Sequence, residues 1–256
     1  MKVILASNDN PNYLPFWPLV SQFWRQRIGF TPVLFHITDE ETDFYEDEFG
    51  LVKKIKALPG PDIPDIHENR AIRYSAFQAQ VVRLWGAQLF PDEFCMLADI
   101  DSLPLQRQYF VDLCKELEDD ALLIPQSDAY EGPLFADCDD AYHLPYTTAK
   151  GSIFRDIFDA NCDFQTFAER LAGTNKGWHT DEIYLYQCAR KYQKCRLGRR
   201  GYEDGLPLRC INRDRGWQYS TDRIAADWYI DCYMPRTGGE PCFDMIRLLG
   251  FYQIYS

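Results

Sequence analysis

Short apolar runs alternate with longer amphipathic stretches along this chain. The runs at residues 3–6, 33–37, 55–58 and 94–98 are apolar and end in polar or turn-forming residues. Runs this short predict buried strands, because a helix would need a longer periodic stretch. Residues 13–28 repeat apolar side chains close to helical spacing. Strand, helix and strand in this order predict the start of a parallel nucleotide-binding sheet in an α/β protein.

The second part of the chain continues the same alternation. Residues 68–89 predict a long helix, 109–117 a shorter helix and 121–125 a strand. A helix is predicted to begin after Lys150, and another to begin at Thr180 as its N-cap residue. Residues 228–236 predict a last short apolar strand that ends at a proline. No repeat or linker interrupts the pattern, so a single domain is expected over residues 1–256.

Composition and charge narrow the classes of partner. The chain has 256 residues, of which 46% are hydrophobic, so it is long enough for one substantial α/β core. A net charge of −12 argues against nucleic acid as a partner. Ten of the 27 basic residues lie between Ala189 and Arg223, where they could face a diphosphate or an anionic glycan, or form a solvated basic surface.

Cysteine usage and the N-terminus predict a soluble, cytoplasmic protein. The nine cysteines are scattered without a Cys-x-x-Cys pair, which favours reduced thiols over a disulfide framework or a zinc site. The apolar run at residues 3–6 is too short for a signal peptide or a membrane anchor.

The most informative stretch follows the fourth apolar run. Residues 94–98 end in Asp99-Ile100-Asp101, and Pro104 comes shortly afterwards. Ligands of open α/β sheets bind at the carboxyl ends of the strands, where these two carboxylates are expected. Mg²⁺-type cations favour one or two carboxylates together with phosphate oxygens. The stretch therefore indicates a metal site, with a plain Asp-rich turn as the alternative.

An apolar strand that ends in Asp-x-Asp, followed by an apolar residue and proline, resembles the metal and nucleotide-sugar motif of GT-A-fold glycosyltransferases, and in particular the small soluble enzymes of large algal viruses. The resemblance implies Mn²⁺ or Mg²⁺ bound by Asp99 and Asp101, with Asp99 also contacting the nucleotide sugar. It implies nucleotide contacts from Ala6, Ser7 and Asn8, at the end of the first strand.

The same resemblance assigns roles to charged residues elsewhere in the chain. Several GT-A families carry a basic residue on the helix before the Asp-x-Asp strand; Arg83 fits best and Arg73 is the second choice, with an exposed helix arginine as the alternative for each. The glycine at the start of the helix after Lys150 would allow backbone N–H groups to meet the donor sugar.

Asp181, preferred to Glu182, would face the acceptor as catalytic base. Acids are also favoured in a first helical turn by the helix dipole, which is the alternative for Asp181. A third metal ligand, usually His, is expected near the C-terminus, where none of the four histidines lies. Asp231 could replace it as an oxygen ligand, or water could complete the coordination.

The predicted activity is metal-dependent transfer of a sugar to a hydroxyl of an oligosaccharide or glycoprotein glycan, with UDP-sugar as the donor that the resemblance implies. Inversion is expected if Asp181 is the base, and a retaining mechanism, which would not need this base, is the alternative. Residues 1–105 would form the nucleotide-binding half and residues 106–256 the acceptor-binding half. Two alternatives stay open: a haloacid-dehalogenase-type phosphatase, which also places Asp-x-Asp after an apolar strand, and a catalytically silent module that binds nucleotide sugars or glycans.

Overall fold

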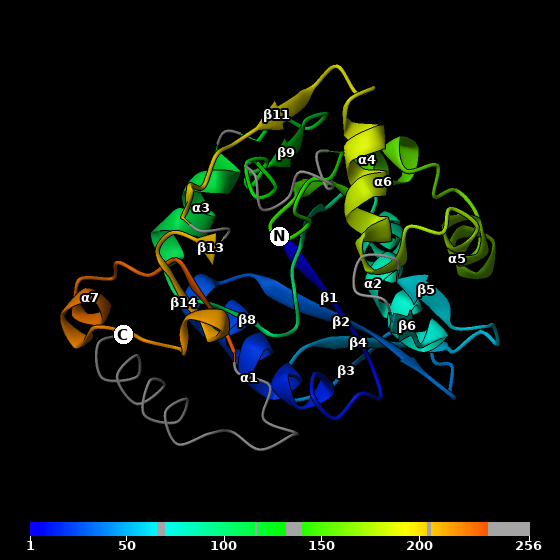
Figure 1. Ribbon diagram of the computed structural model, residues 1–256, viewed down its shortest axis with the longest axis horizontal. Helices are drawn as coiled ribbons and strands as arrows, with labels where there is room; N and C mark the ends of the chain where they lie inside the picture. The colour runs from blue at the N-terminus through cyan, green and yellow to red at the C-terminus, as the bar shows by residue number, and fades with distance from the viewer. Residues whose placement is uncertain (66–69, 116, 132–139, 204–205, 235–256) are drawn as a thin grey trace.

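The computed structural model describes residues 1–65, 70–115, 117–131, 140–203 and 206–234. Its centre is an eight-stranded sheet with the strand order β11-β9-β10-β7-β1-β2-β4-β3 (Figure 1). The strands are β1 Lys2–Asn8, β2 Thr31–Thr38, β3 Tyr45–Glu46, β4 Leu51–Lys56, β7 Phe94–Leu97, β9 Leu122–Ile124, β10 Thr148–Lys150 and β11 Cys195–Leu197. β7, β1, β2 and β4 are parallel, whereas β10 and β3 run antiparallel to their neighbours. The predicted mixed, mainly parallel sheet is confirmed.

Helices cover both faces of this sheet. They are α1 Trp17–Gln22, α2 Tyr74–Gly86, α3 Arg107–Lys115, α4 Gly151–Ile157, α5 Phe164–Ala172, α6 Thr180–Ala189 and α7 Thr221–Ala225. One core cluster joins the sheet to α2, α4, α5 and α6, and a second joins it to α1, α3 and α7. In Figure 1 the first group lies to the right of the sheet, and α3 and α7 lie to the left.

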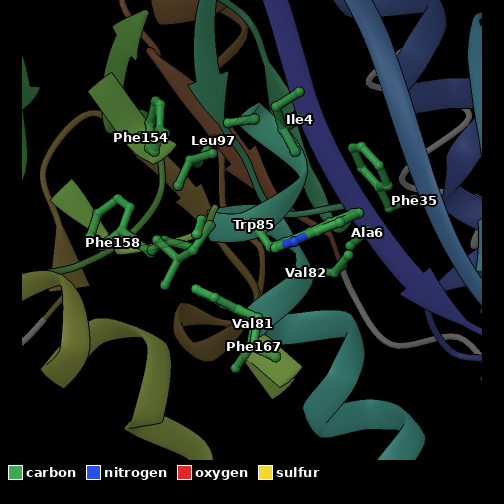
Figure 2. Close-up of a cluster of buried hydrophobic side chains, with 14 of the residues drawn as sticks. Ile4, Ala6, Phe35, Val81, Val82, Trp85, Leu97, Phe154, Phe158 and Phe167 are labelled. Atoms are coloured by element: carbon green, nitrogen blue, oxygen red, sulfur yellow. The ribbon is translucent and has the colours of Figure 1, made fainter. Parts of the chain in front are cut away.

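Strand β1 contributes to both clusters because successive side chains of a strand point to opposite faces. Ile4 and Ala6 belong to the cluster with α2, whereas Val3 and Leu5 belong to the cluster with α1. Figure 2 shows Ile4 and Ala6 close to Trp85 of α2 within the first cluster. Burial on both faces explains why this strand reads as one continuous apolar run.

A second, three-stranded sheet lies beside the Asp-x-Asp segment. It has the order β14-β15-β8, with β8 Ser102–Pro104, β14 Cys210–Asn212 and β15 Asp231–Tyr233. β15 is antiparallel to β8, and Tyr233 is the register partner of Ser102. Two short hairpins complete the strands: β5 Ile63–Asp65 with β6 Arg70–Ile72, and β12 Tyr202–Glu203 with β13 Leu206–Pro207.

Most predicted elements are present, but the third strand and the long helix are misplaced. The strand predicted over residues 55–58 forms earlier, as β4 over Leu51–Lys56. Residues 13–28 form one helical stretch: a 3₁₀ turn over Leu14–Phe16, then α1, then a π-helical turn over Phe23–Ile28. The helix predicted over residues 68–89 is wrong at its start, because Arg70–Ile72 is strand β6 and α2 begins at Tyr74. Pairing of β6 with β5 outweighs the local helical pattern there.

The start of α4 serves packing and not ligand binding. The N–H groups of Gly151 and Ser152 donate to the carbonyls of Glu93 (3.0 Å) and Pro91 (3.1 Å). A Cβ atom at Gly151 would lie 2.3 Å from the carbonyl oxygens of Ala87 and Phe90. The predicted sugar contact at this helix start is therefore wrong, and glycine is needed for the close approach of the chain after α2.

Two findings concern the environment of the protein. Within the described residues, every helix is too short or too polar to cross a lipid bilayer. The described cysteines, which are Cys95, Cys114, Cys162, Cys188, Cys195, Cys210 and Cys232, are free thiols.

Candidate functional site

A pocket of about 540 Å³ opens where β1 and β7 end. The two strands are parallel neighbours, with Ile4 opposite Leu97, so their carboxyl ends meet at the same edge of the sheet. The lining combines the end of β1 and the loop behind it, one face of α2, the Asp-x-Asp segment and the first turn of α6. The pocket therefore occupies the place that the sequence predicted for ligand binding.

The end of β1 forms the first wall. Ala6, Ser7 and Asn8 line the pocket, as the predicted nucleotide contacts should, and Tyr13 of the following loop lines it as well. The Asn8 side-chain amide donates to the hydroxyl of Ser75 at 3.0 Å, which ties this wall to the start of α2.

Helix α2 forms the second wall. Its residues Ala76, Ala79, Gln80 and Arg83 line the pocket, and their spacing of three and four places them on one helical face. The two alanines leave space, whereas Gln80 and Arg83 contribute the polar groups of this face. Arg73, the second choice for a nucleotide contact, is exposed at the N-cap of α2 and is not among the lining residues.

Arg83 connects the Asp-x-Asp segment to α6. It is only 9% exposed, so its interpretation as an exposed helix arginine is wrong. One guanidinium nitrogen forms an ion pair with Asp99, and the other lies 2.9 Å from Oδ2 of Asp181. Burial works against its charge, but the two carboxylates more than offset this and hold the pKa of Arg83 above its usual value.

Asp99 and Asp101 both line the pocket, each facing an arginine. Asp99 pairs with Arg83, and Asp101 pairs with Arg213. The carbonyl of Asp101 also accepts a hydrogen bond from the N–H of Met234 at 2.9 Å, which fixes the motif against the chain after β15. Arg213 was not singled out from the sequence, where the only signal was its place in the basic segment after Ala189.

Asp181 is a buried carboxylate in the lining of the pocket. It is 2% exposed, and its Oδ1 accepts the N–H of Glu182 at 3.0 Å. Burial raises the pKa of Asp181 to about 6, although the Arg83 guanidinium lowers it. The predicted N-cap role of Thr180 is wrong, because a 3₁₀ turn over Gly177–His179 precedes α6 and the Thr180 hydroxyl donates to the Gly177 carbonyl at 2.8 Å.

A polar cluster around Glu182 forms another wall of the pocket. The Glu182 carboxylate accepts the Tyr130 hydroxyl at 2.6 Å and lies 2.9 Å from Nδ1 of His179. Burial opposes ionisation, but the His179 contact and the nearby His143 hold the pKa of Glu182 below its usual value. With Trp178 beside them, these residues form an ionised, partly aromatic wall that the sequence pattern did not reveal.

Asp231 lies outside the pocket lining. Its two carboxylate oxygens each lie 2.6 Å from a guanidinium nitrogen of Arg200, and Oδ2 also accepts the Tyr146 hydroxyl at 2.7 Å. Both side chains of the Arg200 pair are fully buried. The structure does not support Asp231 as a metal ligand, because its carboxylate forms a buried ion pair with Arg200 outside the pocket.

The pocket lining contains more carboxylates than arginines, so its charge would be balanced by a bound cation. Four carboxylates (Asp99, Asp101, Asp181 and Glu182) and two arginines (Arg83 and Arg213) line it. The described part of the chain contains no group of three or more His, Cys, Asp or Glu side chains placed to hold a metal ion. Two carboxylates are nevertheless sufficient for Mg²⁺ or Mn²⁺ when phosphate oxygens and water complete the coordination. Asp99 and Asp101 are the two residues of the lining that would hold such a cation.

Comparisons with solved structures identify the fold of this chain, whereas sequence comparisons find no match. No protein-family model matches the sequence, and a search of curated proteins finds no match. Among solved structures, an active-site mutant of LgtC is similar with a TM-score of 0.52 and 12% identity, covering 99% of this chain and 96% of that one. The galactosyltransferase LgtC in complex with donor and acceptor sugar analogues gives a TM-score of 0.51 at the same identity and coverage. The fold is that of LgtC.

The glycosyltransferase GlyE of Streptococcus pneumoniae is a further match, with a TM-score of 0.49 and 12% identity, covering 98% of this chain and 59% of that one. The similarity to LgtC extends over nearly the whole chain, including both predicted halves. The predicted GT-A fold is therefore confirmed.

Proposed function

We propose that this protein is a glycosyltransferase that moves a sugar from a nucleoside diphosphate sugar to the hydroxyl of a glycan. The observation that carries the proposal is the Asp99–Arg83–Asp181 arrangement in the pocket at the strand ends. It joins a carboxylate of the Asp-x-Asp motif to a buried carboxylate on another element, in a fold shared with a galactosyltransferase.

The pocket offers a place for each part of such a donor. The nucleoside would lie along Ser7, Asn8 and Tyr13, and the diphosphate beside Asp101 and Arg213. The sugar would then extend towards the wall around Glu182. The nucleotide is proposed to be UDP, as the resemblance of the motif to GT-A enzymes implies.

Asp99 and Asp101 would hold Mn²⁺ or Mg²⁺ against the diphosphate. The cation would neutralise the charge that develops on the leaving diphosphate. The guanidinium groups of Arg83 and Arg213 are positioned in the same part of the pocket, where charge-assisted hydrogen bonds can hold phosphate oxygens and orient them.

Asp181 would act as the general base. A base is most effective when its pKa lies near the working pH, and burial raises the pKa of Asp181 to about 6. The ionised carboxylate would accept the proton of the acceptor hydroxyl while that oxygen attacks the anomeric carbon from the face opposite the diphosphate. The configuration at that carbon is then inverted.

Incubation with a panel of nucleotide sugars, Mn²⁺ and oligosaccharide acceptors tests the activity. We expect consumption of a UDP-sugar with formation of UDP and a glycoside of inverted configuration, read by proton NMR. A retained configuration would contradict the role of Asp181. Release of phosphate from phosphomonoesters would favour the phosphatase alternative, and binding without turnover would favour the silent module.

A further inference from the structure

Tyr233 lines the pocket and carries a buried hydroxyl. The residue is 9% exposed and lines the pocket together with Asp99, Asp101 and Arg213. Within the described part of the chain its hydroxyl has no hydrogen-bond partner. A buried polar group without a partner destabilises a folded protein, so its presence in a pocket points to a ligand.

Other tyrosines around the site have protein partners. Tyr130 donates to Glu182 at 2.6 Å, and Tyr146 donates to Asp231 at 2.7 Å. Two more buried polar atoms without partners, Oε1 of Gln80 and Nδ1 of His143, belong to residues that line the same pocket. Three of the seven buried atoms without partners within the described residues therefore belong to residues that line this pocket, where a polar ligand could replace the missing contacts.

Strand pairing places Tyr233 next to the segment that carries Asp101. β15 holds Tyr233 opposite Ser102, which directly follows Asp101, and the next residue, Met234, donates its N–H to the Asp101 carbonyl. The oxygens of a diphosphate accept hydrogen bonds, so they complement a hydroxyl donor. A neutral hydroxyl donor beside the two carboxylates is therefore suited to a phosphate oxygen.

We propose that the Tyr233 hydroxyl binds the diphosphate of the donor and donates a hydrogen bond to one of its oxygens. This assignment rests on the proposed function. Burial, and secondarily the charge of Asp99, raises the pKa of Tyr233 well above its usual value, so the hydroxyl keeps its proton at any working pH. Tyr233 thus adds a neutral donor to the two arginines that face the leaving group.

The test compares Tyr233→Phe with Tyr229→Phe. Tyr229 is equally buried, at 4% exposure, but its hydroxyl accepts the N–H of Ser220 at 2.9 Å and the residue does not line the pocket. Calorimetry would measure the affinity of each variant for UDP and for inorganic pyrophosphate in the presence of Mn²⁺. The melting temperature of each variant would be recorded without ligand.

For Tyr233→Phe we expect about tenfold weaker binding of both UDP and pyrophosphate, the loss typical of a hydrogen bond to a charged acceptor. Its melting temperature should be unchanged or higher, because no protein contact is lost. Tyr229→Phe should behave in the opposite way, with a lower melting temperature and unchanged affinities. Unchanged affinities in Tyr233→Phe, or a loss confined to its melting temperature, would overturn the assignment.

The wild-type protein separates this assignment from the proposed function. If it binds UDP and pyrophosphate but Tyr233→Phe binds them equally well, only the role of Tyr233 fails. If the wild type binds neither compound with Mn²⁺, the proposed donor class fails and the assignment fails with it.

Discussion

Arg83 links the two carboxylates on which the proposed chemistry depends. Its guanidinium forms ion pairs with Asp99 and Asp181, and all three side chains line one pocket. Removing one partner from a buried ion pair leaves the other charge without compensation, which is costly. The arginine therefore couples Asp99 of the Asp-x-Asp motif to Asp181, the proposed base.

Replacing Arg83 by lysine tests this coupling without removing the charge. A lysine ammonium cannot span two carboxylates as the planar guanidinium does. We expect UDP affinity in the presence of Mn²⁺ to fall by about tenfold in Arg83→Lys, measured by calorimetry. Arg25→Lys is the control, because Arg25 forms an exposed pair with Glu46 away from the pocket. Equal affinities in the two variants would contradict a role for Arg83 in donor binding.

The pH dependence of the reaction tests Asp181. Its raised pKa of about 6 predicts that kcat/KM, which reports the groups of the free enzyme, rises tenfold per pH unit below about pH 6 and levels off above it. Asp181→Asn should lower the rate by about 10²–10⁴-fold and remove this limb from any remaining activity, while UDP affinity is retained. A limb at the same pH in the variant would assign it to another group.

The raised pKa of Asp181 also makes the stability of the protein depend on pH. The folded protein holds the Asp181 proton more tightly than the unfolded chain, where the pKa lies near 3.8. The contribution of Asp181 to the free energy of unfolding is therefore favourable at low pH and falls as the pH rises from about 3.8 to about 6. Urea denaturation across this range should show that the wild type loses stability relative to Asp181→Asn.

Among the elements, β15 fixes the segment that follows the Asp-x-Asp motif. Asp231 at its start is held by Arg200, and the Tyr146 hydroxyl connects Asp231 to the Ser102 hydroxyl in β8, with distances of 2.7 and 2.8 Å. This buried network joins segments that are far apart in the sequence. The network stabilises strand β8, which directly follows Asp101, and none of its carboxylates lines the pocket.

Asp231→Asn separates a structural role from the metal-ligand role expected from the sequence. Leaving the buried Arg200 charge without its carboxylate should cost about 3–5 kcal/mol of the free energy of unfolding, measured by urea denaturation. The folded variant should bind UDP and Mn²⁺ as tightly as the wild type at low temperature. A stable variant that has lost its metal-dependent affinity would restore Asp231 as a ligand.

The junction of α4 with the chain after α2 gives a prediction about packing. A methyl group at Gly151 would meet two carbonyl oxygens at 2.3 Å, so Gly151→Ala should lower the melting temperature strongly. Gly173→Ala is the control, because a methyl group there would find its closest contact at 3.5 Å and Gly173 has a helical φ of −62°. A Gly151→Ala variant as stable as Gly173→Ala would contradict the close approach.

Local patterns predicted the elements that lie within one continuous run of the chain. The first strand and the strand before Asp99 follow from short apolar runs, whereas Arg83 was selected through the resemblance to GT-A enzymes. The same patterns could not predict β6, because its hairpin partner β5 determines its conformation. They also missed Arg213 and the cluster around Glu182, since residues from distant segments meet there only after folding.

At the scale of the whole molecule, the central sheet unites the two predicted halves. β9, β10 and β11 of the second half extend the sheet that β1, β2, β4 and β7 of the first half begin. The pocket is also shared, with Asp99 from the first half and Asp181 from the second. The division at residue 105 therefore remains a functional prediction, and the structure shows no separation of the halves into two sheets.

Most of the basic segment after Ala189 pairs with acids of the same molecule. Lys194 pairs with Asp120, Arg196 with Glu118, and Arg199 with Glu131, all at the surface around β9 and β11. Only Arg213 of the segment lines the pocket. The interpretation of the segment as a surface for an anionic ligand is thus limited to this arginine within the described residues.

The proposed function depends on a divalent cation that Asp99 and Asp101 would hold against the diphosphate of a nucleotide sugar. Calorimetric titration of UDP into the wild type and into Asp101→Asn, each with and without Mn²⁺, measures this dependence. Asp112→Asn is the control, because Asp112 lies on the surface of α3 and is not a lining residue. We expect Mn²⁺ to strengthen UDP binding in the wild type and in Asp112→Asn but not in Asp101→Asn. An equal effect of Mn²⁺ on all three proteins would contradict it.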